Sequence, residues 1–178
     1  VETEIEKLQK IIPENIFGYD TETLAGVIGK LLKEREKTLA IAESCTGGFI
    51  SHLITSVAGS SAYFNGAVTA YSNQIKEKIL GVKSETLIEN GAVSEAVARE
   101  MVTGVKKALN ADFAIATTGI AGPDGGTPEK PVGTIWIAVT DGNEVVAEKY
   151  IFGDNRKRNI IRSSQTALQM LRRLILKP

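Results

Sequence analysis

The sequence predicts an α/β protein, specifically a three-layer α/β/α sandwich with a mixed sheet. Short apolar runs typical of buried strands alternate with amphipathic stretches at helical spacing. Late in the chain, two alternating stretches around Asp141-Gly142-Asn143 predict a hairpin, which adds antiparallel strands to the sheet. A chain of 178 residues can bury one sizeable core, so we expect one domain over 21–178 with a short appendage.

Composition excludes several classes of protein. Hydrophobic residues make up 43% and charged residues 24%, as in soluble globular domains. The 21 basic residues balance the 21 acidic ones, which argues against nucleic-acid binding through bulk charge. No apolar run is long enough to span a membrane. One cysteine, Cys45, and one histidine, His52, exclude an intrachain disulfide and argue against a Cys/His metal site, so we expect no metal site and a reducing, cytoplasmic setting.

The first part of the chain predicts an appendage, a helix and the first strand. Residues 1–20 are expected to form an N-terminal arm or interdomain linker, with a charged helix over 2–12. Thr21 is the expected N-cap of the next helix. The apolar stripe of that helix has i, i+3, i+4 spacing and consists of Leu24, Val27, Ile28, Leu31 and Leu32. A buried strand over 38–42 and a helix over 47–57 follow.

Alternating short elements fill the middle of the chain. We expect strands over 63–71 and 112–117, and helices over 74–79, 84–89 and 95–109. Ser72-Asn73 begins the first of these helices, and Ser94 caps the last. There is no internal repeat and no low-complexity tract.

A glycine-rich loop, 117–131, separates the buried strand from the hairpin strands 133–140 and 145–152. It is too long for a simple turn, and loops of that length are often functional. A type I′-like turn is expected in the hairpin, and the closing helix is expected to begin near Arg156. Ligand loops in α/β sheets follow the carboxyl ends of strands, where both this loop and the 43–48 loop lie.

The 43–48 loop joins the buried strand directly to a helix, and it carries Ser44, Thr46 and two glycines. The first N–H groups of a helix are unpaired and lie at the positive end of its dipole, so an anion can bind there. The N–H groups of Cys45 through Gly48 would suit an oxyanion or a phosphate. The alternative is a tight, well-capped turn without function.

Candidate catalytic groups lie on three segments: Ser44 and Thr46, then Tyr71 and Lys76, then Thr118. No histidine lies in these segments, so a Ser-His-Asp triad is excluded unless His52 reaches the site; a surface or packing role suits its mid-helix position better. A lysine can act as the base if burial leaves its amine neutral, and Tyr71 could relay a proton. Cys45 is a rival nucleophile, with a small buried side chain as the alternative. From the residues alone, Lys76 is also compatible with a solvated helix lysine.

Several uncommon motifs, taken together, resemble the CinA C-terminal domain family. The resemblance spans roughly 16–174, nearly the whole chain, at matching order and spacing. The motifs are Ala42-Glu43-Ser44-Cys45-Thr46-Gly47-Gly48, Gly59-Ser60-Ser61, Tyr71-Ser72-Asn73 with Lys76, Thr117-Thr118-Gly119-Ile120-Ala121-Gly122-Pro123, Gly125-Gly126-Thr127 and Lys130-Pro131-Val132-Gly133-Thr134. In this family many members also carry an N-terminal domain similar to molybdopterin-binding proteins, for which 1–20 would be the end of the linker.

The resemblance implies a nicotinamide mononucleotide amidohydrolase, which releases ammonia and forms nicotinic acid mononucleotide in pyridine nucleotide salvage. By position, Ser44 matches the nucleophile proposed for the family. Tyr71 and Lys76 match the proposed proton-transfer partners, and Thr118 matches a further active-site threonine. The family implies no metal or organic cofactor, a small nucleotide as substrate, and a homo-oligomer. The alternative is a non-catalytic nucleotide-binding or interaction domain.

Substrate binding is expected to involve both loops and the last helix. The expected residues are Thr46, Gly47, Gly48, Gly119, Gly122, Lys130 and Arg156. The substrate phosphate needs a cationic or N–H-lined pocket, for which Lys130, the glycines and Arg156 stay open as candidates. The match is weaker in Gly153-Asp154-Asn155-Arg156, because one residue separates the Gly-Asp pair from the arginine and the arginine that the family pattern places four positions later is Ile160 here. Arg158 and Arg162 stay open as substitutes for it.

Overall fold

The computed structural model describes residues 7, 11, 12 and 16–177, so most of the helix expected over 2–12 lies outside the described residues. The elements are α2 (Leu24–Glu34), β1 (Leu39–Glu43), α3 (Phe49–Thr55), a 3₁₀ turn η2 (Ser60–Ala62), β2 (Phe64–Thr69), α4 (Asn73–Leu80), α5 (Ser84–Asn90), α6 (Glu95–Ala108), β3 (Phe113–Gly119), β4 (Thr134–Thr140), β5 (Val145–Ile151) and α7 (Arg156–Leu176). Their order agrees with the order predicted from the sequence.

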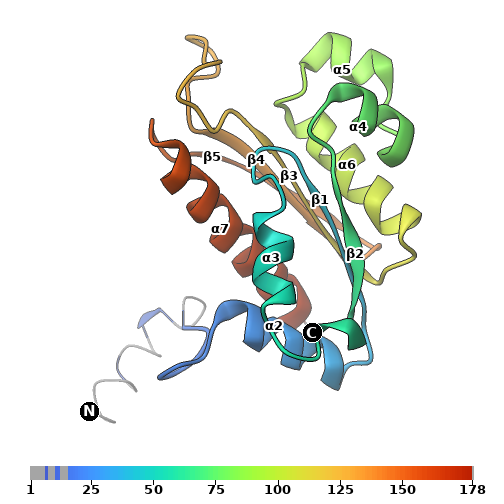
Figure 1. Ribbon diagram of the computed structural model, residues 1–178, viewed down its shortest axis with the longest axis vertical. Coiled ribbons are helices and arrows are strands. Elements are labelled where there is room, and N and C mark those ends of the chain that lie inside the picture. Colours follow the sequence, from blue (N-terminus) through green and yellow to red (C-terminus); the bar gives the residue numbers. More distant parts are fainter. Residues whose placement is uncertain (1–6, 8–10, 13–15, 178) are drawn as a thin grey trace.

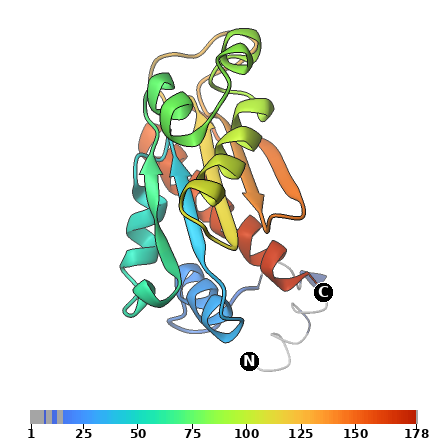
Figure 2. The same ribbon diagram turned by 90° about the vertical axis from the view of Figure 1, so that its right-hand side faces the viewer.

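The five strands form one mixed sheet in the order β2-β1-β3-β4-β5. β1 pairs in parallel with both β2 and β3, whereas β4 is antiparallel to β3 and to β5. The carboxyl ends of β1 and β2 therefore meet at one edge of the sheet, at the upper end in Figure 2, and β3 ends at the same edge. Both functional loops predicted from the sequence leave the sheet at this edge.

Helices cover both faces of the sheet (Figure 1), which confirms the three-layer prediction. The side chains of each strand alternate between the two faces. In β1, Leu39 and Ile41 pack with α2, α3 and α7, whereas Ala40 and Ala42 pack with α4, α5 and α6. The alanine face continues across the sheet in β3 and β4.

Small residues allow close approach on the alanine face. The backbone of α6 at Gly104 lies so near the Leu80 carbonyl that a side chain on Gly104 would collide with the end of α4. Gly104 therefore sets the position of α4 against α6 and the sheet. This placement matters for function, because α4 carries Lys76.

Side chains cap four of the helices. Ser72 and Ser94 cap α4 and α6 as predicted, accepting hydrogen bonds from N–H groups three residues later. The cap of α2 is Thr23, which accepts from the Gly26 N–H, so the prediction of Thr21 was wrong. Both threonines precede the apolar stripe, but Thr23 is the residue immediately before the helix, so its hydroxyl reaches the N–H of the third helical residue, whereas Thr21 lies two residues further back. Asn155 caps α7.

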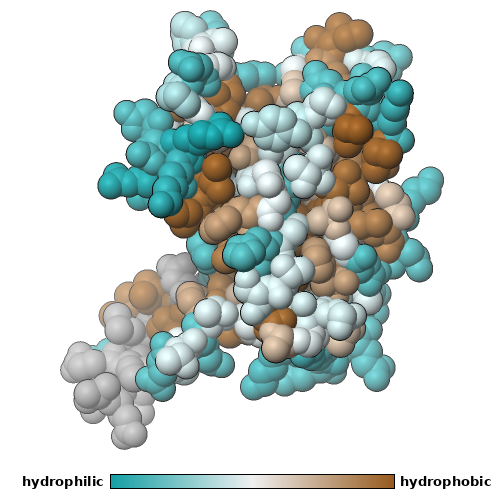
Figure 3. Space-filling view, in the orientation of Figure 1, coloured by the Kyte–Doolittle hydropathy of each residue, from teal (hydrophilic) through white to brown (hydrophobic). Residues whose placement is uncertain are grey.

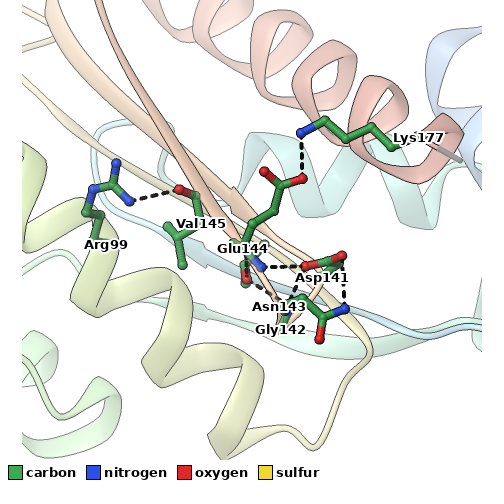
Figure 4. A network of polar contacts seen from close by, with 8 residues as sticks. Arg99, Asp141, Gly142, Asn143, Glu144, Val145 and Lys177 are labelled. Carbon is green, nitrogen blue, oxygen red and sulfur yellow. Dashed lines mark hydrogen bonds and ion pairs between the residues drawn. The ribbon is translucent and has the colours of Figure 1, made fainter.

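The end of β3 and the hairpin turn differ from the prediction for identifiable reasons. β3 continues to Gly119, because its last residues pair with β4. The hairpin turn is a four-residue connection and not the expected type I′ turn. Figure 4 shows the reason: the Asp141 carboxylate accepts hydrogen bonds from the N–H groups of Asn143 and Glu144, so a side chain replaces the usual backbone bond. Arg99 of α6 also binds the Val145 carbonyl, which ties the hairpin to α6.

Candidate active site

Ser44 lies at the carboxyl edge of the sheet, immediately after β1. Its N–H donates to the Thr117 carbonyl at 3.0 Å, which continues the pairing of β1 with β3 by one residue. The sharp turn that follows leads into α3 within five residues. Ser44 is thus fixed by sheet hydrogen bonding, although its side chain belongs to a loop, and 8% of the residue is exposed.

Lys76 of α4 brings its amine to Ser44. The residue is 2% exposed, and its Nζ donates to the Ala70 carbonyl at 2.8 Å and to Ser44 Oγ at 3.1 Å. Burial lowers the pKa of the amine, and nearby Cys45 opposes this shift more weakly. No carboxylate forms an ion pair with Lys76 within the described residues, so nothing there restores the charged form. The sequence left two alternatives for Lys76, a catalytic base and a solvated helix lysine. The burial of the side chain excludes the solvated lysine.

A cavity of about 210 Å³ opens beside Ser44 and Lys76. All four predicted catalytic residues line it, together with two of the seven predicted substrate-binding residues, Gly119 and Arg156. The complete lining is Ser44, Cys45, Tyr71, Asn73, Lys76, Ala92, Val93, Thr118, Gly119, Ala121 and Arg156.

The other predicted catalytic residues make specific contacts at the walls of this cavity. The Thr118 hydroxyl donates to the Ala92 carbonyl at 2.7 Å, which holds the segment between α5 and α6 against the site. Tyr71 is 64% exposed, and its hydroxyl accepts a hydrogen bond from Arg156 at 3.2 Å. The same guanidinium donates to the Gly122 carbonyl at 2.8 Å, so Arg156 links the start of α7 to two loops.

The remaining predicted substrate-binding residues lie outside the cavity lining. Thr46 Oγ1 hydrogen-bonds to Thr117 Oγ1 at 2.8 Å and is buried. Gly47 donates its N–H to the Ser44 carbonyl. Lys130 Nζ donates to the Asn90 carbonyl at 2.8 Å, which ties the glycine-rich loop to the end of α5. Gly122 contributes its carbonyl to Arg156, as described above.

The N-terminus of α3 is occupied by a carboxylate of the chain itself. Glu43 is fully buried, and its Oε2 accepts hydrogen bonds from the N–H groups of Gly48 and Ile50, both at 3.0 Å. Its Oε1 accepts from the N–H of Ser51 at 2.8 Å and from the Ser51 hydroxyl at 2.5 Å. The Gly48 N–H, which was predicted to bind a substrate anion, already donates to Glu43. A substrate anion would have to compete with this carboxylate for it.

Cys45 lines the cavity next to Ser44 but is 8% exposed. Burial raises the pKa of its thiol to about 12, an effect that a hydrogen bond with Thr117 opposes only in part. The thiol is therefore protonated at neutral pH, whereas a cysteine nucleophile acts as the thiolate. These contacts favour the packing role of Cys45 over the role of rival nucleophile.

Four residues that line the cavity were not predicted from the sequence. A role for the buried Glu43 was not predicted either. Asn73, Ala92, Val93 and Ala121 line the cavity. Asn73 belongs to the Tyr71-Ser72-Asn73 motif, so its position beside Tyr71 was an available signal. Ala92 and Val93 carry no chemical signal in the sequence, because only the fold brings them to the site.

An apolar groove of about 440 Å³ adjoins the site between α3 and α7. Phe49, Ile160 and Ile161 form its apolar surface, and Arg156 and Lys157 complete its lining. Figure 3 shows hydrophobic side chains in this region bordered by hydrophilic ones. Arg156 lines both the groove and the cavity, so this side chain lies between the two. The arginine absent at position 160 is thus replaced by a residue that belongs to the apolar surface.

Two kinds of feature are absent from the described residues, 7, 11, 12 and 16–177. They contain no group of three or more His, Cys, Asp or Glu side chains placed to hold a metal ion. They also contain no helix that is long and apolar enough to cross a membrane.

The fold and the site define an α/β/α protein with a serine and a buried lysine in contact at the carboxyl edge of parallel strands. The chain belongs to the CinA C-terminal domain family, whose model matches residues 21–175. It is 48% identical over 173 residues to a CinA-like protein of Amoebophilus asiaticus, and 46% identical over 173 residues to a CinA-like protein of Thermotoga maritima. These matches cover 97% and 96% of this chain, but 42% of each relative.

Solved structures of the same superfamily share the fold. The competence/damage inducible protein CihA from Agrobacterium tumefaciens is 40% identical, with a TM-score of 0.85 over 90% of this chain and 98% of that protein. A competence-damaged protein (CinA) superfamily protein from Klebsiella pneumoniae is 32% identical, with a TM-score of 0.83 over 88% of this chain and 98% of that one.

Proposed function

We propose that this chain hydrolyses the carboxamide of nicotinamide mononucleotide by a serine mechanism, releasing ammonia and nicotinic acid mononucleotide. The observation that carries the proposal is the contact of 3.1 Å between Lys76 Nζ and Ser44 Oγ in a buried environment. A hydroxyl is a weak nucleophile until a base removes its proton, and a lysine whose pKa is lowered can be that base. The choice of substrate rests on the resemblance to the family.

In the acylation step, the neutral amine of Lys76 accepts the proton of the Ser44 hydroxyl as Oγ attacks the carboxamide carbon. The carbonyl oxygen becomes an oxyanion, which N–H groups at the turn after Ser44 stabilise. The protonated Lys76 then returns the proton to the amide nitrogen, and the C–N bond breaks to release ammonia. We assign the assistance of this transfer to Tyr71, which lines the cavity.

In the deacylation step, water takes the place of ammonia. Lys76 removes a proton from that water as it attacks the acyl carbon, and the tetrahedral intermediate collapses. The proton returns to Ser44 Oγ, which restores the enzyme and releases the carboxylate product. Thr118 holds the Ala92 wall of the cavity during both steps through its 2.7 Å hydrogen bond.

The charges of the cavity suit an anionic substrate. Among the described residues that line it, Lys76 and Arg156 are basic and none is acidic. Because Lys76 is engaged with Ser44, Arg156 is the residue we assign to the phosphate, and Lys157 adds a second basic side chain beside it. Lys130, bound to the Asn90 carbonyl, is not needed for this assignment.

The chain spans about 42% of the length of the curated relatives that it matches. The proposal therefore concerns this domain and not the activity of a longer protein. Self-association and a cytoplasmic location stay predictions of the sequence.

The direct test is ammonia release from nicotinamide mononucleotide by the purified chain, compared with Ser44→Ala. We expect the variant to lose at least about a thousandfold in kcat, because removing a nucleophile abolishes the covalent route. Ser56→Ala is a matched control, since Ser56 lies on the surface at the end of α3. It should retain the parent rate.

Nucleotide binding separates the two candidate functions. If the parent chain binds the nucleotide, shown by a raised Tm, but releases no ammonia, the domain is a binding module. Full activity in Ser44→Ala would exclude the serine mechanism and return attention to Cys45.

A further inference from the structure

The carboxylate of Glu43 occupies a position that the mechanism does not use directly. It is the last residue of β1, it precedes Ser44, and it is completely buried. Its two oxygens accept four hydrogen bonds from three residues at the start of α3, Gly48, Ile50 and Ser51. A buried carboxylate is costly unless it is well bonded, and these bonds to the positive end of the helix meet that need.

These bonds close the turn that contains Ser44. Glu43 joins the end of β1 to the start of α3. Both ends of the turn 44–48 are therefore held in place relative to each other. A second bond inside the turn, from the Gly47 N–H to the Ser44 carbonyl at 3.2 Å, shapes its first half. Thr46 ties the turn to β3 through Thr117.

The same bonds decide which N–H groups remain available. Gly48 donates to Glu43, Gly47 donates to Ser44, and Phe49 donates to the Thr46 carbonyl. Within the described part of the chain, the N–H groups of Cys45 and Thr46 donate to no backbone or side-chain oxygen, and the Cys45 N–H interacts with the sulfur of its own side chain. Of the four N–H groups that the sequence offered for an oxyanion, two are consumed by the turn itself.

We propose that Glu43 is the positioning residue of the nucleophile turn. Its carboxylate takes the place of an external anion at α3, holds Ser44 Oγ against Lys76 Nζ, and leaves Cys45 and Thr46 as the oxyanion donors. Glu43 precedes Ser44 but does not itself line the cavity, so it acts through Ser44. The assignment of the oxyanion donors rests on the proposed amidase function, whereas the positioning of Ser44 does not.

A second carboxylate provides a matched control. Asp112 accepts hydrogen bonds from the N–H and the hydroxyl of Thr38, both at 2.9 Å, at the opposite end of β1. Asp112→Asn weakens the hydrogen bonds to Thr38 at the amino end of β1, at the opposite end of the strand from Ser44. Glu43→Gln keeps the shape of Glu43 but replaces one accepting oxygen with an NH₂ group that faces N–H donors.

The experiment measures two rates at a temperature below the Tm of every protein compared. The proteins are the parent chain, Glu43→Gln, Ser51→Ala and Asp112→Asn. The first rate is that of ammonia release, separated into kcat and KM. The second is the labelling of Ser44 by a fluorophosphonate, followed by mass spectrometry, which needs no nucleotide. We expect Glu43→Gln to lose about 100-fold in both kcat and labelling with little change in KM, as when one transition-state donor is lost.

Ser51→Ala removes one of the four bonds and should show a smaller loss of the same kind. Asp112→Asn should lower Tm while keeping the parent kcat and labelling rate. Parent-like kcat and labelling in folded Glu43→Gln would overturn the inference, and so would an equal loss in Asp112→Asn. If Glu43→Gln does not fold, Ser51→Ala decides the matter: reduced labelling supports positioning, and unchanged labelling overturns it.

The two proposals fail separately. A parent chain that is labelled at Ser44 but releases no ammonia from the mononucleotide contradicts the proposed substrate and leaves the positioning test in force. A parent chain whose Ser44 is not labelled at all contradicts the positioning of an activated serine.

Discussion

The two ends of β1 carry the same kinds of side chain but differ in what they can do. At the amino end, the Asp112 carboxylate binds Thr38 and pairs with Lys37 at 3.0 Å. At the carboxyl end, the Glu43 carboxylate binds α3, and Lys76 binds a hydroxyl and a carbonyl instead of an acid. Each end thus has one lysine and one hydrogen-bonded carboxylate.

The difference lies in how the lysine and the carboxylate are combined. At the amino end they form a partly exposed ion pair, whose side chains are 47% and 38% exposed. At the carboxyl end they are separated, because the backbone N–H groups of α3 satisfy Glu43 and leave Lys76 without an acidic partner within the described residues. A carboxylate beside a lysine favours its ammonium form, and burial without one favours the amine. Chemistry at the carboxyl end depends on this separation.

Within the comparison of the two ends of β1, the largest expected effect is the contrast between their lysines. Lys76→Met removes the amine but retains a long side chain in the buried site, and we expect kcat for ammonia release to fall by about 100-fold or more. Lys37→Met removes the exposed ion pair, and should change the free energy of unfolding by less than about 1 kcal/mol. Activity assays and chemical denaturation of both variants check this contrast.

Equal losses of activity in the two variants would break the comparison, because they would indicate a general effect of removing charge near β1. A Lys76→Met variant that keeps the parent kcat would show that another group deprotonates Ser44.

The pH dependence sharpens the same comparison. Burial lowers the pKa of Lys76 below its ordinary value of 10.5, and the base must be neutral to act. We therefore expect kcat/KM to rise with pH to a plateau, with a midpoint below 10.5 that disappears in Lys76→Met. Stability should also decrease as the pH falls from 10.5 to the lowered pKa, because over that interval the unfolded chain binds the proton more tightly.

Asp112 titrates in another range. Burial raises its pKa, but hydrogen bonds from Thr38 and Lys37 outweigh that effect, so the net pKa lies below the ordinary 3.8. Its contribution to stability is present above pH 3.8 and is lost as the pH falls through the lowered pKa. A rate profile that follows this acidic range instead of the alkaline one would contradict the role of Lys76.

Local patterns in the sequence predicted most of the fold. The apolar runs at β1 and β3 have the length and composition of buried strands, and the small and polar residues after them mark loops at the carboxyl edge. Helix caps were less certain, because Thr21 and Thr23 both precede the same apolar stripe and only the geometry of the backbone selects one. The hairpin turn was missed because a side chain of Asp141 replaces a backbone bond.

The contacts of the site depend on packing that is not local. Ser44 and Lys76 are 32 residues apart, and the charged helix around Lys76 is compatible with a solvated face. Lys76 is buried in the fold, and its helix α4 packs closely on α6 where Leu80 meets Gly104, a contact between separate segments that the sequence does not reveal. For Lys130 the structure adds a contact that the sequence does not predict: its amine donates to the Asn90 carbonyl, and its use as a phosphate ligand stays a prediction.

The smallest expected effect concerns Cys45, next to Ser44 on the same turn. Because burial raises the pKa of its thiol to about 12, we expect very slow alkylation by iodoacetamide at pH 8, measured by mass spectrometry of the intact chain. Cys45→Ala retains the backbone N–H that we assign to the oxyanion, and its kcat should fall by less than about tenfold, far less than for a lost nucleophile. Rapid alkylation, or a loss in Cys45→Ala as large as that in Ser44→Ala, would make the thiol the nucleophile, and the separation of Lys76 from any acid would then serve Cys45 instead.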